Sequence, residues 1–254
     1  MDSTVGFALL LSALAGLSTT IGSLLSLLVR KPGPRFMAIS LGFSGGVMIL
    51  VSFVELLQAS IESIGFTPAH IAFFGGMVVM FIIDELIPHE YIAEHQHPNA
   101  GMGQERLLKT GLFVALGIGI HNIPEGMVSF AAALKDPSLG IAIAIAIALH
   151  NIPEGISVAM PIYAATGSRR KAFLWSFLSG VAEPIGALLA AIVLSPFLNQ
   201  TVLGYMLAAV AGIMVFISLD ELVPVSRSLS EEHISIVGVV VGMIVMAISL
   251  GILR

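Results

Sequence analysis

Eight long apolar runs constrain what this chain can fold into more than any other feature. They fall at about residues 5–29, 36–58, 69–88, 107–134, 138–165, 172–194, 200–224 and 234–253. Each has about the 20 residues that an α-helix needs to cross a bilayer. Lipid offers no partner to the backbone of an isolated strand, so the runs are expected to be helices. We therefore expect an all-α membrane protein with eight transmembrane helices.

Composition excludes a soluble protein. Apolar residues make up 57% of the chain and charged residues only 11%, whereas roughly a quarter of the residues of a soluble domain are charged. The chain has no cysteine, so a metal site would have to use nitrogen, oxygen or thioether ligands. We expect residues 1–254 to form one transmembrane domain in the lipid bilayer. No nucleotide-binding loop is present, and neither ATP nor nucleic acid is expected as a partner.

A six-residue motif, HNIPEG, occurs twice, at residues 121–126 and 150–155, each time inside an apolar run. Residues i and i+4 share one face of a helix. His121 with Glu125, and His150 with Glu154, therefore each present an imidazole and a carboxylate in one direction, which is half of a site for a divalent cation.

The proline within each motif adds a second feature. It cannot donate a backbone hydrogen bond, so it frees the carbonyl four residues earlier, at Ile120 and at Leu149. Freed backbone is tolerated in a membrane only where protein or a water-filled cavity meets it. Each freed carbonyl is therefore a spare oxygen ligand or a contact for water.

The two motifs are expected at the same depth in the membrane. The turn signal Lys135-Asp136-Pro137 lies midway between them, and an antiparallel pair of helices then places His121 beside His150. Both would lie about 20 Å from the turn, inside a hydrocarbon layer about 30 Å thick. Alternatively, the polar side chains only join the helices and the carboxylates are protonated. Ionisable groups inside a membrane are costly and usually functional, which favours a metal site.

An internal repeat indicates how the other helices are arranged. Residues 46–56 align with 212–222, residues 76–80 with 242–246, and residues 21–25 with 185–189. Five helices separate corresponding members, so the second copy is inverted. We expect two inverted three-helix units, 5–88 and 172–253, around a central pair at 107–165, as in many secondary transporters. Chance similarity between apolar segments is the alternative.

The positions of the basic residues predict the orientation of the chain in the membrane. With the N-terminus outside the cytoplasm, the inner connections hold nine Lys and Arg residues and the outer side only two, Lys135 and Arg254. Both termini are then outside the cytoplasm.

Two further carboxylates fall within the apolar runs. Glu183, followed by Pro184, has no Lys or Arg in its own run, so it is neutral, paired with a distant group, or a metal ligand; its counterpart in the repeat is Thr19. Glu55 lies near the outer end of its run and either reaches the membrane surface or contributes to the site. A third group lies toward the cytoplasmic ends and either lines an exit path or caps helices: Asp84, Glu85, Asp220 and Glu221.

The connection between the third and fourth runs contains three histidines, His89, His95 and His97. A solvated loop and a weak metal-capture segment are both compatible with this composition. As part of an exit path, these histidines would join the acidic residues at the cytoplasmic ends of the helices.

The paired motifs resemble those of the ZIP (Zrt-, Irt-like) family of divalent-metal transporters, and the chain resembles a bacterial branch of that family over nearly its full length. The resemblance implies the bacterial cytoplasmic (inner) membrane and a binuclear centre bridged by Glu125 and Glu154. One site would add His150, with His121 and Glu55 nearby, and the other would add Asn122, Asn151 and Glu183. The sequence leaves open whether the chain forms a homodimer.

The function expected from the motif and the resemblance is import of divalent transition metal ions, with Zn²⁺ and Fe²⁺ leading and Mn²⁺, Co²⁺ and Cd²⁺ as further candidates. Imidazole with carboxylate suits zinc, whereas amide and carboxylate oxygens suit iron(II) or manganese. A metal-gated channel or sensor could use the same ligands. An intramembrane metallohydrolase is disfavoured because the His-Glu-x-x-His spacing is absent. We expect a transporter and not an enzyme.

Overall fold

The computed structural model describes residues 3–28, 33–86, 104–197, 199–230 and 232–253, and all regular structure within these ranges is helical. His89, His95 and His97 lie outside the described residues. The helical elements are α1 (Ser3–Leu28), α2 (Pro34–Val51), η1 (Ser52–Leu56), α3 (Leu57–Ile64), α4 (Phe66–Leu86), α5 (Gln104–Lys135), α6 (Pro137–Thr166), α7 (Arg169–Leu189), η2 (Ala190–Leu194), η3 (Ser195–Phe197), α8 (Gln200–Ile217), η4 (Ser218–Leu222), α9 (Val223–Leu229) and α10 (Glu232–Leu253).

The prediction of an all-α membrane protein is confirmed. Several elements continue one another without a break, so the described residues form eight helical runs. Seven of these are long and apolar enough to cross a membrane, and the remaining one is α5. Two runs extend past their predicted ends, to Ile64 and to Leu229. Glu55 therefore lies inside its run and not near its outer end, which corrects the expectation from the sequence.

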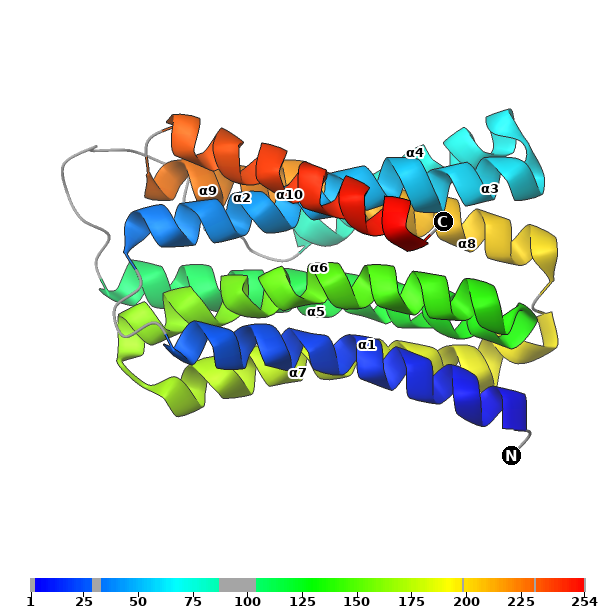
Figure 1. The fold of residues 1–254 in the computed structure, drawn as a ribbon, viewed down its shortest axis with the longest axis horizontal. Coiled ribbons are helices and arrows are strands. Elements are labelled where there is room, and N and C mark those ends of the chain that lie inside the picture. The colour runs from blue at the N-terminus through cyan, green and yellow to red at the C-terminus, as the bar shows by residue number, and fades with distance from the viewer. Residues whose placement is uncertain (1–2, 29–32, 87–103, 198, 231, 254) are drawn as a thin grey trace.

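The helices form two layers (Figure 1). One layer contains α1, α5, α6 and α7, and the other contains α2, α4, α8 and α10 with the short elements that continue α2 and α8. Apolar side chains fill the interface between the layers. Val128 of α5 and Ile143 of α6 belong to the same buried cluster as Val51 of α2 and Met214 of α8.

Close contacts between the helices repeat with a fixed spacing along the chain. Gly46 packs directly on the carbonyl of Val239. The same contact recurs between Gly212, 166 positions after Gly46, and the carbonyl of Phe73, 166 positions before Val239. In the same way Gly76 packs on Ala209, and Gly242 on Phe43. Gly42 likewise lies against the carbonyl of Ser235.

The layer that contains the motifs repeats its contacts too. Gly22 of α1 packs on the carbonyl of Ile152, and Gly186 of α7 packs on the carbonyl of Ile123. A pseudo-two-fold axis therefore exchanges α1 with α7, α2 with α8, α4 with α10 and α5 with α6. Since α2 and α8 run in opposite directions (Figure 1), the two three-helix units are inverted. Two positions that are exchanged by this axis are termed repeat-related.

Candidate metal centre

The two motif helices are antiparallel over their whole length. Asp136 accepts a hydrogen bond from the backbone nitrogen of Ser138 at 2.8 Å and caps α6, while Pro137 occupies its first turn. Near this turn Gly140 packs on Ala133, and far from it Gly111 packs on Ile162. A proline in the first turn fits the geometry of a helix start. The connection between the helices is thus short, and the two motifs lie level with each other.

The histidine and the glutamate of each motif pair across the two helices. Nε2 of His121 lies 3.1 Å from Oε1 of Glu154, and Nε2 of His150 lies 3.3 Å from the carboxylate of Glu125. The sequence spacing predicted that each histidine would act with the glutamate of its own helix. The observed pairs are crossed instead, so each half of the site combines residues from both motifs.

A backbone hydrogen bond explains the crossing. Nδ1 of His121 donates to the carbonyl of Gly117 at 3.1 Å, and Nδ1 of His150 donates to the carbonyl of Ala146 at 3.1 Å. Helical side chains tilt toward the N-terminus of their helix, and this bond holds each ring over the preceding turn. The bond also fixes which nitrogen faces the partner helix, because the carbonyl can only accept. Nε2 is therefore the nitrogen available to a metal ion.

The motif asparagines attach the central pair to the flanking helices. Nδ2 of Asn122 donates to the carbonyl of Ser179 in α7 at 2.9 Å, and Nδ2 of Asn151 donates to the carbonyl of Ala15 in α1 at 3.0 Å. The two bonds are repeat-related. Asn151 also donates to Oε2 of Glu183 at 2.7 Å, so the structure brings Glu183 to the motif residues.

The centre contains buried oxygen atoms that accept no hydrogen bond from the part of the chain that the structure describes. The seven polar side chains from the two motifs and α7 are all at most 1% exposed. Within the described residues, five of their oxygens have no hydrogen-bond partner: Oδ1 of Asn122 and Asn151, Oε1 of Glu125 and Glu183, and Oε2 of Glu154. Of these, Oε1 of Glu125 lies 3.3 Å from Nε2 of His150. Leaving a buried acceptor unsatisfied is costly. A cation between these oxygens would satisfy them.

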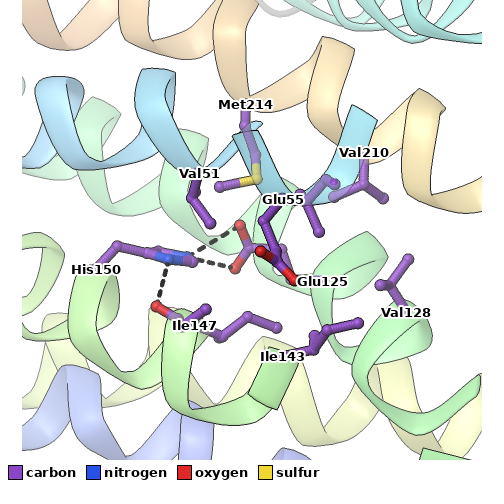
Figure 2. Close-up of a pocket in the computed structure, with 11 residues that line it drawn as sticks. Val51, Glu55, Glu125, Val128, Ile143, Ile147, His150, Val210 and Met214 are labelled. Atoms are coloured by element: carbon purple, nitrogen blue, oxygen red, sulfur yellow. Dashed lines mark hydrogen bonds and ion pairs between the residues drawn. The ribbon is translucent and has the colours of Figure 1, made fainter. Parts of the chain in front are cut away.

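A pocket lies next to the His150–Glu125 pair (Figure 2). Glu55, from the π-helical segment η1, enters it together with Glu125 and His150, and the remaining lining is apolar. The structure thus brings Glu55 to the motif residues Glu125 and His150. Glu55 is half-buried, so its carboxylate lies at the edge of the centre.

Glu221 occupies the repeat-related position on the other side of the centre. It lies in the π-helical segment η4, which is repeat-related to η1. Its carboxylate contacts the backbone of α5 at Gly117, where it would overlap an added Cβ, one turn before His121. The sequence alignment already equated Glu221 with Glu55, but sequence reasoning assigned Glu221 only to an exit path or a cap.

The other residues expected along an exit path differ in burial. Asp84 is buried, at 6% exposed. Asp220 is half-buried and Glu85 is exposed. The burial of Asp84 does not fit a helix cap at the membrane surface, whereas the exposure of Glu85 does.

The candidate ligands do not surround one point. In the part of the chain that the structure describes, no three His, Asp or Glu side chains form a group that could hold a metal ion as placed. The histidines and glutamates instead form the two separate crossed pairs. Their donor set of imidazole nitrogen with carboxylate and amide oxygen is nevertheless one that zinc and iron(II) accept. Binding would require rotation of side chains within the centre.

Inverted units around a buried polar centre define a class of protein. Seven apolar spans, a pseudo-two-fold axis and ionisable groups at the interface of the two halves are typical of multi-pass membrane transporters that alternate access to a central site. This is the class that the fold and the centre together indicate.

Comparison with known proteins identifies the family within this class. The family model described as ZIP Zinc transporter matches residues 88–250. Relatives named zinc transporter ZupT are 48% identical in Nitratidesulfovibrio vulgaris, over 98% of each chain, and 51% identical in Chlorobium phaeovibrioides, over 96% of each chain. The one from Streptococcus mutans is 48% identical over 96% of each chain. This chain belongs to the ZIP zinc transporter family. Both the resemblance seen in the sequence and the prediction of a transporter rather than an enzyme are confirmed.

Proposed function

We propose that this chain imports divalent transition metal ions across the bacterial cytoplasmic membrane, with Zn²⁺ and Fe²⁺ as the leading substrates. The observation that carries the proposal is the group of buried acceptors without donors beside the crossed His–Glu pairs. Such a group has the charge and the ligand types that a divalent cation requires. The names of the curated relatives support zinc among the substrates.

The proposed centre holds two ions. The first is bound by His150 with the bridging carboxylates of Glu125 and Glu154, and His121 and Glu55 lie beside it. The second is bound by the asparagines and Glu183 with the same two bridging carboxylates. The crossed pairs support bridging, because each motif carboxylate already faces the partner helix. The hydrogen bond from Asn151 to Glu183 supports a shared second site.

The proposed path enters through the pocket that contains Glu55 and leaves past Glu221 and Asp84. The repeat-related positions of Glu55 and Glu221 support a path with one acidic residue on each side of the centre. Mn²⁺, Co²⁺ and Cd²⁺ are further candidate ions for the same ligands. We also propose that the three units at 5–88, 107–165 and 172–253 form one domain, with both termini outside the cytoplasm. A homodimer remains compatible with this arrangement.

A metal-gated channel or sensor is the second candidate. The described centre is enclosed and its acceptors are buried, which favours a carrier, because an ion must then wait for a change in the protein before it leaves. Uptake by a carrier saturates at low metal concentration, whereas flux through an open channel continues to rise.

Uptake into liposomes tests the proposal. Purified protein is reconstituted, and entry of radioactive ⁶⁵Zn²⁺ and ⁵⁵Fe²⁺ is measured over a range of concentrations, with and without a pH gradient. We expect saturable uptake that disappears in the double variant Glu125→Gln/Glu154→Gln. Uptake equal to that of empty liposomes would contradict the transport function, and uptake that does not saturate would favour the channel.

A further inference from the structure

Thr19 of α1 is a buried polar residue next to the centre that the two proposed sites do not use. Its side chain is 0% exposed, and its hydroxyl has no hydrogen-bond partner within the described residues. A threonine hydroxyl in a helix can usually bond to a carbonyl of the preceding turn, as Thr166 does with Ile162 at 2.7 Å. The hydroxyl of Thr19 makes no such bond, so it is available to another group.

The hydroxyl of Thr19 lies beside the backbone that the motif asparagine of α5 contacts. An added Cβ on Gly180 would lie 3.0 Å from the Cβ of Thr19 and 3.3 Å from its Oγ1. The residue before Gly180 is Ser179, whose carbonyl accepts the hydrogen bond of Asn122. The hydroxyl and the Asn122 amide therefore converge on the same short segment of α7.

Thr19 is also repeat-related to Glu183. The carbonyl of Thr19 packs on Gly155, directly after Glu154, and the carbonyl of Glu183 packs on Gly126, directly after Glu125. Glu183 uses this position to reach Asn151. The same axis directs Thr19 toward Asn122, whose Oδ1 has no partner among the described residues.

We propose that Thr19 provides a neutral oxygen ligand to the ion held between Asn122, Asn151 and Glu183. The ligand set would then consist of oxygens only, two amides, a hydroxyl and carboxylates, which is the preference of hard divalent cations such as Mn²⁺ and of Fe²⁺ more than of Zn²⁺. The axis thus supplies two repeat-related ligands, of which one is charged and one is neutral. This inference rests on the proposed metal centre and assigns one more ligand to it.

Replacement by an isosteric residue isolates the hydroxyl. Thr19→Val keeps the shape and removes the oxygen, Thr19→Ser keeps the oxygen, and Thr20→Val is a matched control because its hydroxyl also has no partner among the described residues. Binding of Mn²⁺ to purified full-length protein is followed by the loss of the electron paramagnetic resonance signal of the free ion. Bound Zn²⁺ is counted by mass spectrometry.

We expect Thr19→Val to weaken Mn²⁺ binding about tenfold, the effect of removing one supporting contact at a metal site, with little change in the first bound Zn²⁺. Thr19→Ser and Thr20→Val should bind as the wild type does. Without metal, Thr19→Val should unfold at the same temperature or a higher one, since it removes a buried hydroxyl that has no partner. Unchanged Mn²⁺ binding, or a lower unfolding temperature in EDTA, would overturn the assignment.

An exchange of the two repeat-related residues gives a second test by gain of function. Glu183→Thr alone should lose the Mn²⁺ site, and the double variant Thr19→Glu/Glu183→Thr should regain it, because the carboxylate then enters the same cluster from the opposite helix. A double variant that binds no better than Glu183→Thr would overturn the proposal for Thr19 alone. Wild-type protein that binds neither ion would instead overturn the proposed metal centre on which it rests.

Discussion

The crossed pairs make the four charged motif residues one unit at the scale of single residues. Each histidine is held by a carbonyl of its own helix and directed at the glutamate of the other. Removing one glutamate therefore leaves a buried imidazole on the partner helix without its acceptor, and such loss of one partner of a buried pair is costly. The same crossing places both carboxylates between the helices, where a bridging ligand has to lie.

The charge of Glu183 predicts how many ions the centre holds. With Glu55, Glu125, Glu154 and Glu183 ionised, the centre carries four negative charges, which two divalent ions neutralise. Glu183→Lys leaves three carboxylates and one ammonium, which one divalent ion neutralises. Because uncompensated charge away from water is costly, we expect this variant to bind one ion per chain and to keep some zinc uptake.

Metal content measured on the purified Glu183→Lys protein checks this prediction. Glu62→Lys is a suitable control, since Glu62 is exposed and hydrogen-bonded to Gln58 at 2.9 Å. Two ions in the Glu183→Lys protein would show that Glu183 is not a ligand. No ion at all would show that the two positions do not fill independently.

Sequence reasoning identified the motif residues but not their partners. The i and i+4 spacing placed His121 and Glu125 on one face, which the structure retains, and the turn at residues 135–137 set the two motifs level. Whether a side chain then meets its own helix or the next depends on the rotation of both helices and on the bond from Nδ1 to the preceding turn. Neither is encoded in a local pattern, so the crossed pairing could not be foreseen.

Glycine contacts hold the elements at backbone distance. Where α2 meets α10 and where α4 meets α8, two glycines, one from each helix, pack on a carbonyl of the neighbouring helix. Such contacts are common between helices in membranes, where small residues permit close packing. The aligned segments of the repeat contained these glycines, and for that reason the inverted units could be predicted. The π-helical segments η1 and η4 had no signal in the sequence, because they depend on the packing of the two layers.

Two neighbouring glycines of α4 test this packing. Gly76→Ala would place a Cβ against the carbonyl of Ala209, whereas nothing lies within 4 Å of a Cβ added at Gly75. We expect Gly76→Ala to lower the free energy of unfolding by about 1–3 kcal/mol, as overpacking does. Gly75→Ala should change it by less than about 1 kcal/mol, in the stabilising direction. Thermal unfolding in detergent measures both, and equal effects of the two substitutions would contradict the described crossing.

The molecule as a whole combines a symmetric scaffold with an asymmetric centre. The axis exchanges the three-helix units and the two motifs, yet Glu183 is repeat-related to Thr19. The number and order of the helices could be predicted from apolar runs and the repeat, because lipid requires long helical spans. The position of Glu55 along its helix could not be predicted, since the helical run continues past the predicted end to Ile64.

The distribution of charge predicts the orientation of the whole molecule. Nine of its eleven Lys and Arg residues fall on connections of one side, and basic connections stay in the cytoplasm. We expect alkaline phosphatase fused after Arg254 to be active and green fluorescent protein fused there to be dark. The same two reporters placed after Arg170 should give the reverse result. A bright fluorescent fusion after Arg254 would contradict the orientation.

Metal content of the double variant Glu125→Gln/Glu154→Gln tests the central claim most directly. Both substitutions keep the shape of the side chain and remove the two charges that the proposed ions share. Bound zinc is counted by mass spectrometry in purified protein that elutes as a single species, with Glu62→Gln as control. We predict two ions per chain in the wild type and the control, and none in the double variant. Two ions retained in the double variant would contradict a metal centre built on these carboxylates.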